Sequence, residues 1–203
     1  MKQIYSQRDF YTKKAKQEKY PARSVYKLEE IDKKYNLIKK GDKVLDLGCA
    51  PGSWLIYIAK KADKVVGVDV LGMKIKIPQN AVFFKKDIME FIPSEVEGGN
   101  YDVVVSDLAP TTSGIEFVDA ERSLEYCERA LEIAKRVLSP HQNFGSGDLN
   151  KGGNFVCKIF EGEGTDEFFK KVKQNFEFAK KFKPKASRKQ SREIYIVGKG
   201  FGE

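Results

Sequence analysis

The segment Val44–Trp54 constrains the fold of this chain more than any other stretch of its sequence. Its apolar run contains an acid, breaks at Gly48, turns through Pro51-Gly52 and enters a helical pattern at Ser53. In a parallel sheet this pattern is a strand, a tight turn and a helix N-terminus, the place where such sheets bind nucleotides. The segment therefore predicts an α/β protein with a nucleotide-type ligand at this turn.

The same turn argues against two common phosphate sites. Only Gly48 and Gly52 interrupt the segment, so it lacks the G-x-G-x-x-G of a dinucleotide site, and an NAD-dependent dehydrogenase is disfavoured. It also lacks the Lys-Ser/Thr pair of a P-loop. A glycine turn without phosphate-binding residues suits a nucleoside that carries a small zwitterion. We therefore expect S-adenosyl-L-methionine here.

Strand-like and helical patterns alternate along the rest of the chain. Strands are expected at 43–47, 64–70, 81–84, 101–108, 153–160, 176–182 and 193–198. Helices are expected at 53–61, 118–138 and 165–176. A further helix should begin after Ser24, with Ser24 as its N-cap, and residues 5–19 should form a loose helix or an arm. The alternation predicts a mostly parallel seven-stranded sheet with helices on both faces. Only 183–192 separates the last two strands, so we expect an antiparallel pair, with an antiparallel edge strand.

Size and composition fit one domain spanning 1–203, with a basic segment at 1–22 and a polar, mobile loop at 139–151. No run is long enough to span a membrane, and the first residues lack the apolar block of a signal peptide. We therefore expect a cytoplasmic monomer without a membrane partner. Cys49, Cys127 and Cys157 lie far apart and His141 stands alone, so we expect core thiols and no metal site.

The charge distribution is uneven. Residues 1–40 carry 12 Lys and Arg against 5 Asp and Glu, and residues 170–203 carry 11 against 3, whereas residues 41–169 carry 14 against 21. Two basic ends around an acidic centre suggest that the termini hold a polyanion, with a cofactor site between them. The alternative is that the lysine-rich ends are simply solvated.

Acidic residues near the strand ends are candidates for holding the cofactor. Asp69 ends the second strand, where a carboxylate can accept both ribose hydroxyls. Asp87 follows the third strand, where it could hold an adenine amino group or cap a helix at Ile88. Trp54 either walls the pocket or packs in the core. Asp107 ends the fourth strand and is expected to point into the same crevice as the first turn, which contains Asp46, Gly48 and Gly52.

A lysine inside an apolar strand is the sharpest anomaly in the chain. Lys158 lies within Phe-Val-Cys-Lys-Ile-Phe, and a buried lysine is rare unless it is paired. Its expected partner is Asp107, at the end of the neighbouring strand, and a purely structural salt bridge is the alternative. Glu193 opens the last strand. Lys27 lies off the apolar phase of its helix, so taken alone it would be a solvated lysine.

Five motifs in this order resemble the FtsJ/RrmJ family of S-adenosylmethionine-dependent RNA 2′-O-ribose methyltransferases, from about residue 5 to the C-terminus. The motifs are Ala22-Arg-Ser-Val-Tyr-Lys-Leu, Asp46-Leu-Gly-Cys-Ala-Pro-Gly-Ser-Trp, Ser106-Asp-Leu-Ala-Pro, Val156-Cys-Lys-Ile-Phe and Ala186-Ser-Arg-Lys-Gln-Ser-Arg-Glu-Ile-Tyr-Ile-Val. The resemblance implies the family's Rossmann-like methyltransferase fold. It also implies a catalytic tetrad formed by Lys27, Asp107, Lys158 and Glu193.

The resemblance implies methyl transfer to a ribose 2′-oxygen, most typically of a uridine in large-subunit ribosomal RNA. The ribose of a tRNA anticodon loop is the nearest alternative target. A non-catalytic RNA-binding protein would leave the buried Lys158 unexplained. Lys158 is expected beside the 2′-hydroxyl, where it either takes the proton or orients the oxygen lone pair. The residues expected to meet RNA phosphates are Lys13, Lys14, Arg23, Lys185, Arg188 and Lys189.

The chain departs from the family pattern in two places. The loop at 139–151 is longer than the brief Pro-Gly-Gly turn of the family. No appended RNA-binding domain follows the last strand, so we expect the domain itself, or the assembled target, to supply the grip on RNA.

Overall fold

A computed structural model describes residues 2–92, 100–142, 145, 147–149 and 151–202. The helices are α1 (Lys2–Gln17), α2 (Val25–Tyr35), α3 (Ser53–Ala59), α4 (Glu116–Val137) and α5 (Thr165–Asn175). The strands are β1 (Lys43–Leu47), β2 (Lys64–Asp69), β3 (Ala81–Lys85), β4 (Val103–Ser106), β5 (Asn154–Phe160), β6 (Phe176–Phe182) and β7 (Glu193–Phe201). The predicted elements are therefore present, with shifts of a few residues at most of their ends.

The seven strands form one sheet in the order β3-β2-β1-β4-β5-β7-β6. Strands β1 to β5 pair in parallel, and β7 runs antiparallel to both of its neighbours. This confirms the mostly parallel sheet and the antiparallel pair at one edge. The edge strand is β6, which pairs with the antiparallel strand β7, and β7 lies between β6 and β5. The short link after β6 allows only a hairpin, and β7 fills the place beside β5.

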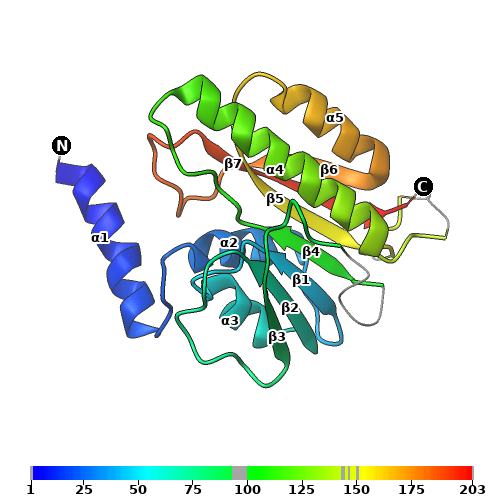
Figure 1. Ribbon diagram of the computed structural model, residues 1–203, viewed down its shortest axis with the longest axis horizontal. Helices are drawn as coiled ribbons and strands as arrows, with labels where there is room; N and C mark the ends of the chain where they lie inside the picture. Colours follow the sequence, from blue (N-terminus) through cyan, green and yellow to red (C-terminus); the bar gives the residue numbers. More distant parts are fainter. Residues whose placement is uncertain (1, 93–99, 143–144, 146, 150, 203) are drawn as a thin grey trace.

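Helices cover both faces of the sheet. Helices α4 and α5 lie on one face, and α2 and α3 lie on the other (Figure 1). The alternation of strand side chains divides the core accordingly: Leu45 and Leu47 pack with α4 and α5, whereas Val44 packs with α2 and α3. Val156 of β5 also lies on the α2/α3 face. Lys158, two residues further along the strand, therefore faces the same side.

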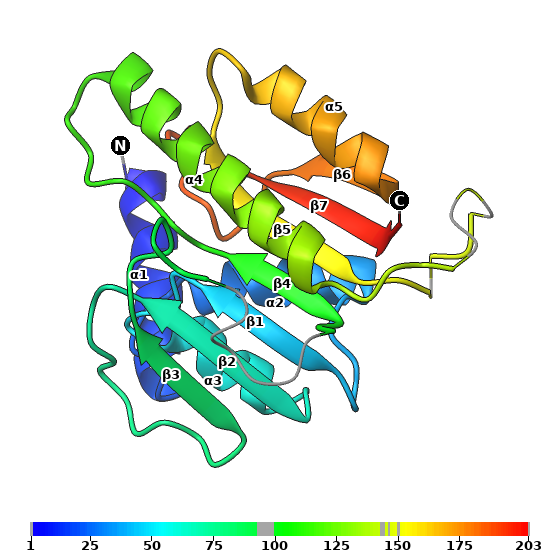
Figure 2. The ribbon, with the colours of Figure 1, turned by 45° about the vertical axis from the view of Figure 1, so that its right-hand side comes forward.

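The helix α1 stands beside the main body and joins it through residues 18–24, as the two views show (Figures 1 and 2). Its C-terminal part contacts the body through a small cluster formed by Ala15, Val25, Tyr26 and Ala186. The N-terminal segment is thus a regular helix that meets the loop between β6 and β7. Within the described part of the chain, no helix is long and apolar enough to cross a membrane.

Several local expectations need correction. No helix begins at Ile88; Asp87 instead accepts the backbone N–H of Met89 at 2.9 Å within a turn. Ser24 holds the N-cap position of α2 but its side chain makes no capping hydrogen bond. The three cysteines are buried, which confirms their core role. In the predicted loop at 139–151, residues 143, 144, 146 and 150 lie outside the described residues, so its mobility remains a prediction.

Candidate active site

The predicted pair of Lys158 and Asp107 is present where β4 ends beside β5. The Lys158 side chain is only 8% exposed, and its Nζ lies 3.0 Å from Oδ1 of Asp107. The same ammonium donates to the Asp107 backbone carbonyl at 2.6 Å. The pair holds because Ser106 lies opposite Cys157 in the parallel register, which brings the next residue of each strand to the same level.

A tyrosine that the sequence reasoning missed completes this contact. Tyr195 lies directly opposite Lys158 in the antiparallel β5–β7 register, and its hydroxyl donates to Oδ1 of Asp107 at 2.8 Å. Burial raises the pKa of Tyr195 well above its ordinary value, and the Asp107 carboxylate raises it further. The period of two along β7 could have revealed it, because Tyr195 shares a strand face with Glu193.

Asp107 remains a carboxylate despite its position. Burial alone would raise its pKa, but the opposing effects of Lys158, Lys27 and the Tyr195 hydroxyl hold the pKa below the ordinary value. The Asp107 carboxylate therefore lies close to the side-chain nitrogens of two lysines, Lys158 and Lys27.

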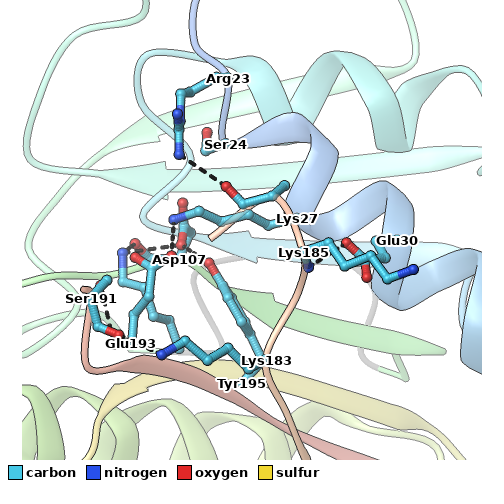
Figure 3. Close-up of polar contacts among 12 residues, drawn as sticks. Arg23, Ser24, Lys27, Glu30, Asp107, Lys183, Lys185, Ser191, Glu193 and Tyr195 are labelled. Carbon is cyan, nitrogen blue, oxygen red and sulfur yellow. Dashed lines mark hydrogen bonds and ion pairs between the residues drawn. The ribbon is translucent and has the colours of Figure 1, made fainter. Parts of the chain in front are cut away.

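Lys27 and Glu193 form the second ion pair of the site (Figure 3). Lys27 Nζ lies 2.6 Å from Oε1 of Glu193, and each side chain is 12% exposed. Lys27 is therefore not the solvated lysine that its helical phase suggested when taken alone. The four residues of the predicted tetrad come together from α2, the end of β4, β5 and the start of β7.

Trp54 connects the first turn to the helix that carries Lys27. Its indole Nε1 donates to the Ser24 carbonyl at 2.9 Å, immediately before α2 begins. The ring is buried in the core and packs against Tyr195 with ring centroids 6.0 Å apart. The structure thus places Trp54 as a packing residue that positions α2, while its contact with a cofactor remains a prediction.

The predicted cofactor acids lie at neighbouring strand ends. Asp46 is completely buried in β1, and neither of its carboxylate oxygens has a hydrogen-bond partner among the described residues. Asp69, at the end of β2, accepts the backbone N–H groups of Ala50 at 2.9 Å and Leu71 at 2.8 Å. Asp107 follows β4. These three residues, which we call the carboxylate cradle, form an acidic site at the carboxyl ends of β1, β2 and β4.

The two glycines of the first turn are required by close contacts within the chain. Gly48 has φ +79°, and a Cβ atom there would lie 2.8 Å from Cγ of Leu108. Gly52 has φ +112°, and its Cβ would lie 2.6 Å from Cδ1 of Ile75. The segment after β2 therefore lies directly on the turn, and a larger residue at either glycine would be strained. The predicted contact of Gly52 with a cofactor remains untested.

The two basic ends of the chain meet beside the tetrad. Arg23 donates from Nη2 to the Ala186 carbonyl at 2.9 Å, and the Lys185 backbone N–H donates to Oε2 of Glu30 at 2.8 Å. Figure 3 shows the segment with Lys183 and Lys185 alongside α2 and beside the side chains of Lys27 and Glu193. The exposed members of the predicted RNA set are Lys13, Lys185, Arg188 and Lys189.

The other two members of that set have structural roles as well. Lys14 is half-buried, lies 4.4 Å from the centre of the Tyr26 ring and pairs with Glu18 at 3.7 Å. Arg23 is half-buried and anchors the β6–β7 loop. These contacts join the basic ends into one surface, whereas the binding of RNA to it remains a prediction.

A cavity of about 560 Å³ lies elsewhere, between the start of α4 and the loop after β5. Its charged lining is acidic apart from Arg192, which pairs with Glu116 at 3.0 Å. None of the predicted cofactor residues lines this cavity. The strand ends, the glycine turn and the buried acid without a hydrogen-bond partner among the described residues come together instead at the carboxylate cradle.

Comparisons with known proteins identify the family of the chain. A family model described as FtsJ-like methyltransferase matches residues 20–201. A protein named Ribosomal RNA large subunit methyltransferase E from Desulfatibacillum aliphaticivorans is 48% identical over 196 residues, covering 94% of this chain and 89% of the relative. A protein of the same name from Desulforapulum autotrophicum is 48% identical over 197 residues, covering 95% and 92%.

Solved structures show the same relationship. A crystal structure described as a ribosomal RNA methyltransferase from Plasmodium falciparum has a TM-score of 0.75 and 26% identity, and the match covers 91% of this chain and all of the other. The family match spans nearly the whole chain and includes every residue of the tetrad. The chain therefore belongs to the FtsJ-like methyltransferase family.

Proposed function

We propose that this methyltransferase uses S-adenosyl-L-methionine to methylate a ribose 2′-hydroxyl of RNA, that of a uridine in large-subunit ribosomal RNA. The observation that carries the proposal is the convergence of Lys158, Asp107, Lys27 and Glu193 beside the carboxylate cradle. The names of the relatives favour ribosomal RNA over tRNA.

The residues of the cradle fit the proposed cofactor. S-adenosylmethionine supplies a methyl group on a positively charged sulfur and also carries an ammonium group. Asp46, Asp69 and Asp107 give the site negative charge, and the two oxygens of Asp46 lack partners among the described residues. Asp69 would hold the ribose and Asp87 the adenine. The cradle therefore matches a cationic nucleoside in both charge and position.

Lys158 is the group proposed to face the attacking 2′-oxygen. Asp107 occupies two of its hydrogen-bonding directions, through the carbonyl and Oδ1. A neutral amine has two hydrogens and one lone pair, so it could keep both contacts and accept the hydroxyl proton. An ammonium has a third hydrogen, which would instead orient the 2′-oxygen. In both cases Asp107 fixes the position of Nζ, and alignment supplies much of the rate.

The remaining residues of the site position Lys27 or bind the RNA. Glu193 fixes Lys27 on the side of the site next to the basic surface. The phosphates of the RNA would lie on the exposed basic residues of α1 and of the β6–β7 loop. Such binding weakens steeply as salt rises.

The test is to map 2′-O-methylation in ribosomal RNA and tRNA with and without the protein, together with Lys158→Ala. We expect one methylated ribose in large-subunit RNA, no methylation by the variant, and cofactor binding by the variant close to that of the wild type. Lys171→Ala is the matched control, because Lys171 is an exposed lysine of α5 paired with Glu128, outside the proposed site. Methylation by Lys158→Ala would overturn the assigned role, and methylation of tRNA alone would overturn the target.

A further inference from the structure

Asp46 is a buried acid that the surrounding chain leaves without a partner. Its side chain is 0% exposed, and among the described residues no hydrogen-bond donor reaches either oxygen. Asp32 shows what this chain does with another buried acid: it accepts the backbone N–H groups of Leu37 and Ile38, accepts the Tyr57 hydroxyl and pairs with Lys61. Because buried polar groups are normally hydrogen-bonded, the isolation of Asp46 needs an explanation.

The charged neighbours of Asp46 are negative. In the sheet, Asp46 lies opposite Gly67 of β2 on one side and opposite Val105 of β4 on the other. The titratable groups that act on it are the carboxylates of Asp107 and Asp69, and the buried Cys49 thiol lies in the turn that follows.

The cations of the site act on a different acid. Lys158 and Lys27 both lower the pKa of Asp107, whereas the charged groups that shift the pKa of Asp46 are the carboxylates of Asp107 and Asp69. Among the described residues, Asp46 therefore has no hydrogen-bond donor that would stabilise a negative charge on its carboxyl group.

This environment favours the neutral acid. Burial raises the pKa of Asp46 well above its ordinary value, and the Asp107 and Asp69 carboxylates raise it further. A positively charged ligand in the cradle would reverse the balance, because an opposite charge favours the ionised carboxyl. The proposed cofactor carries that charge on its sulfur and its ammonium group.

We propose that Asp46 exchanges a proton with solvent as the cofactor binds: it is a carboxylic acid in the free protein and becomes a carboxylate when the cationic cofactor enters the cradle. The inference rests on the proposed function. The O–H bond of the acid breaks, its electron pair stays on the carboxylate oxygen, and the proton goes to the buffer. In the free protein, a neutral Asp46 avoids the cost of burying a further negative charge beside Asp69 and Asp107. In the complex, the ionised Asp46 pairs with the positive charge of the ligand.

The proposal predicts a definite pH dependence of binding. Since binding releases a proton, higher pH favours the complex. The affinity rises by up to about tenfold for each pH unit over the range in which Asp46 is protonated in the free protein and ionised in the complex. A cradle whose acids are all ionised before binding would show no such rise.

Calorimetry with S-adenosylmethionine tests the proposal directly. The binding heat is measured at one pH in two buffers with small and large ionisation enthalpies, and the difference gives the number of protons released. We expect a release approaching one proton per cofactor for the wild type. Asp46→Asn should abolish the release and still bind cofactor, because an amide imitates the neutral acid in shape. Asp166→Asn, which alters an exposed acid of α5 outside the proposed site, should bind cofactor like the wild type and keep the release.

A second measurement does not depend on a folded variant. The infrared difference spectrum of the wild type should show that cofactor binding removes a protonated carboxyl C=O band and adds carboxylate bands. Binding with equal heats in the two buffers and no such infrared change would overturn the inference while leaving the proposed function intact. A full proton release from folded Asp46→Asn would assign the proton to another group. No binding of S-adenosylmethionine by the folded wild type would overturn the proposed function itself.

Discussion

The Lys158–Asp107 pair can be tested as a contributor to stability, separately from any role in chemistry. The variant Lys158→Met keeps the length and the apolar part of the side chain and removes the charge. Asp107 then loses both contacts with Nζ, at 2.6 and 3.0 Å, and keeps the Tyr195 hydroxyl and the more distant charge of Lys27. The carboxylate itself thereby loses one of the two side-chain groups that contact Oδ1 directly.

The magnitude follows from the burial of the pair. Removing one partner of a fully buried ion pair costs about 3–5 kcal/mol of unfolding free energy. Asp107 is 15% exposed and retains Tyr195, so we expect a loss of about 2–3 kcal/mol near neutral pH. The double variant Asp107→Asn/Lys158→Met removes both charges, and it should be more stable than the sum of the two single losses predicts, by at least about 1 kcal/mol.

The pH dependence gives a second check on the same pair. In the wild type the pKa of Asp107 is depressed, so its contribution is present above its unfolded pKa, about 3.9, and is lost as pH falls through the folded value. Without Lys158, burial should raise that pKa, and the folded variant should gain relative stability as its acid protonates. The stability gap between wild type and Lys158→Met should therefore narrow from about pH 7 to about pH 4.

The assay is urea unfolding of the four proteins (wild type, the two single variants and the double variant) at several pH values. Lys171→Met is the control for loss of an exposed lysine, and it should change stability by less than about 0.5 kcal/mol. Additive losses in the double variant, together with a gap that stays constant with pH, would refute the view that Lys158 compensates a buried charge on Asp107.

Two further predictions concern regions outside the tetrad. Asp32→Asn should lower the unfolding free energy by about 2 kcal/mol in urea unfolding. The neutral amide weakens the hydrogen bonds that the buried carboxylate accepts from the backbone N–H groups of Leu37 and Ile38, whereas Lys61 is 36% exposed and can be hydrated. A change below about 0.5 kcal/mol would contradict this reasoning. Arg188→Ala/Lys189→Ala should leave the melting temperature unchanged, since both side chains are exposed. Its RNA binding, measured over a salt series, should weaken, and the slope of log K against log salt should become shallower by about 1–2; an unchanged slope would remove these residues from the RNA surface.

Local pattern was sufficient for much of the fold. The break at Gly48 and the turn before Ser53 identified the strand, turn and helix, because φ sign and helix entry depend on only a few neighbouring residues. The apolar runs identified seven strands for the same reason. The pairing of Lys158 was predictable from its strand alone, since a charge within a buried apolar run requires a partner.

The place of β7 in the sheet and the role of Trp54 depend on sheet order and helix packing, which local sequence patterns do not encode. The antiparallel strand lies inside the edge because β7 pairs with both β5 and β6, and pairing across the sheet leaves no local signature. Trp54 could be assigned to the core only once the structure showed its contact with the start of α2.

The sequence by itself determined the class of the sheet, the nucleotide-type turn and the acids and lysine that mark the site. Only the tertiary structure decided how they are arranged. It largely buried Lys27 against Glu193, brought Tyr195 onto Asp107 and, within the described residues, left Asp46 without a hydrogen-bond partner. The physical reason is distance along the chain. Charge pairing and burial depend on which elements meet in space, whereas turn geometry and periodicity depend on adjacent residues.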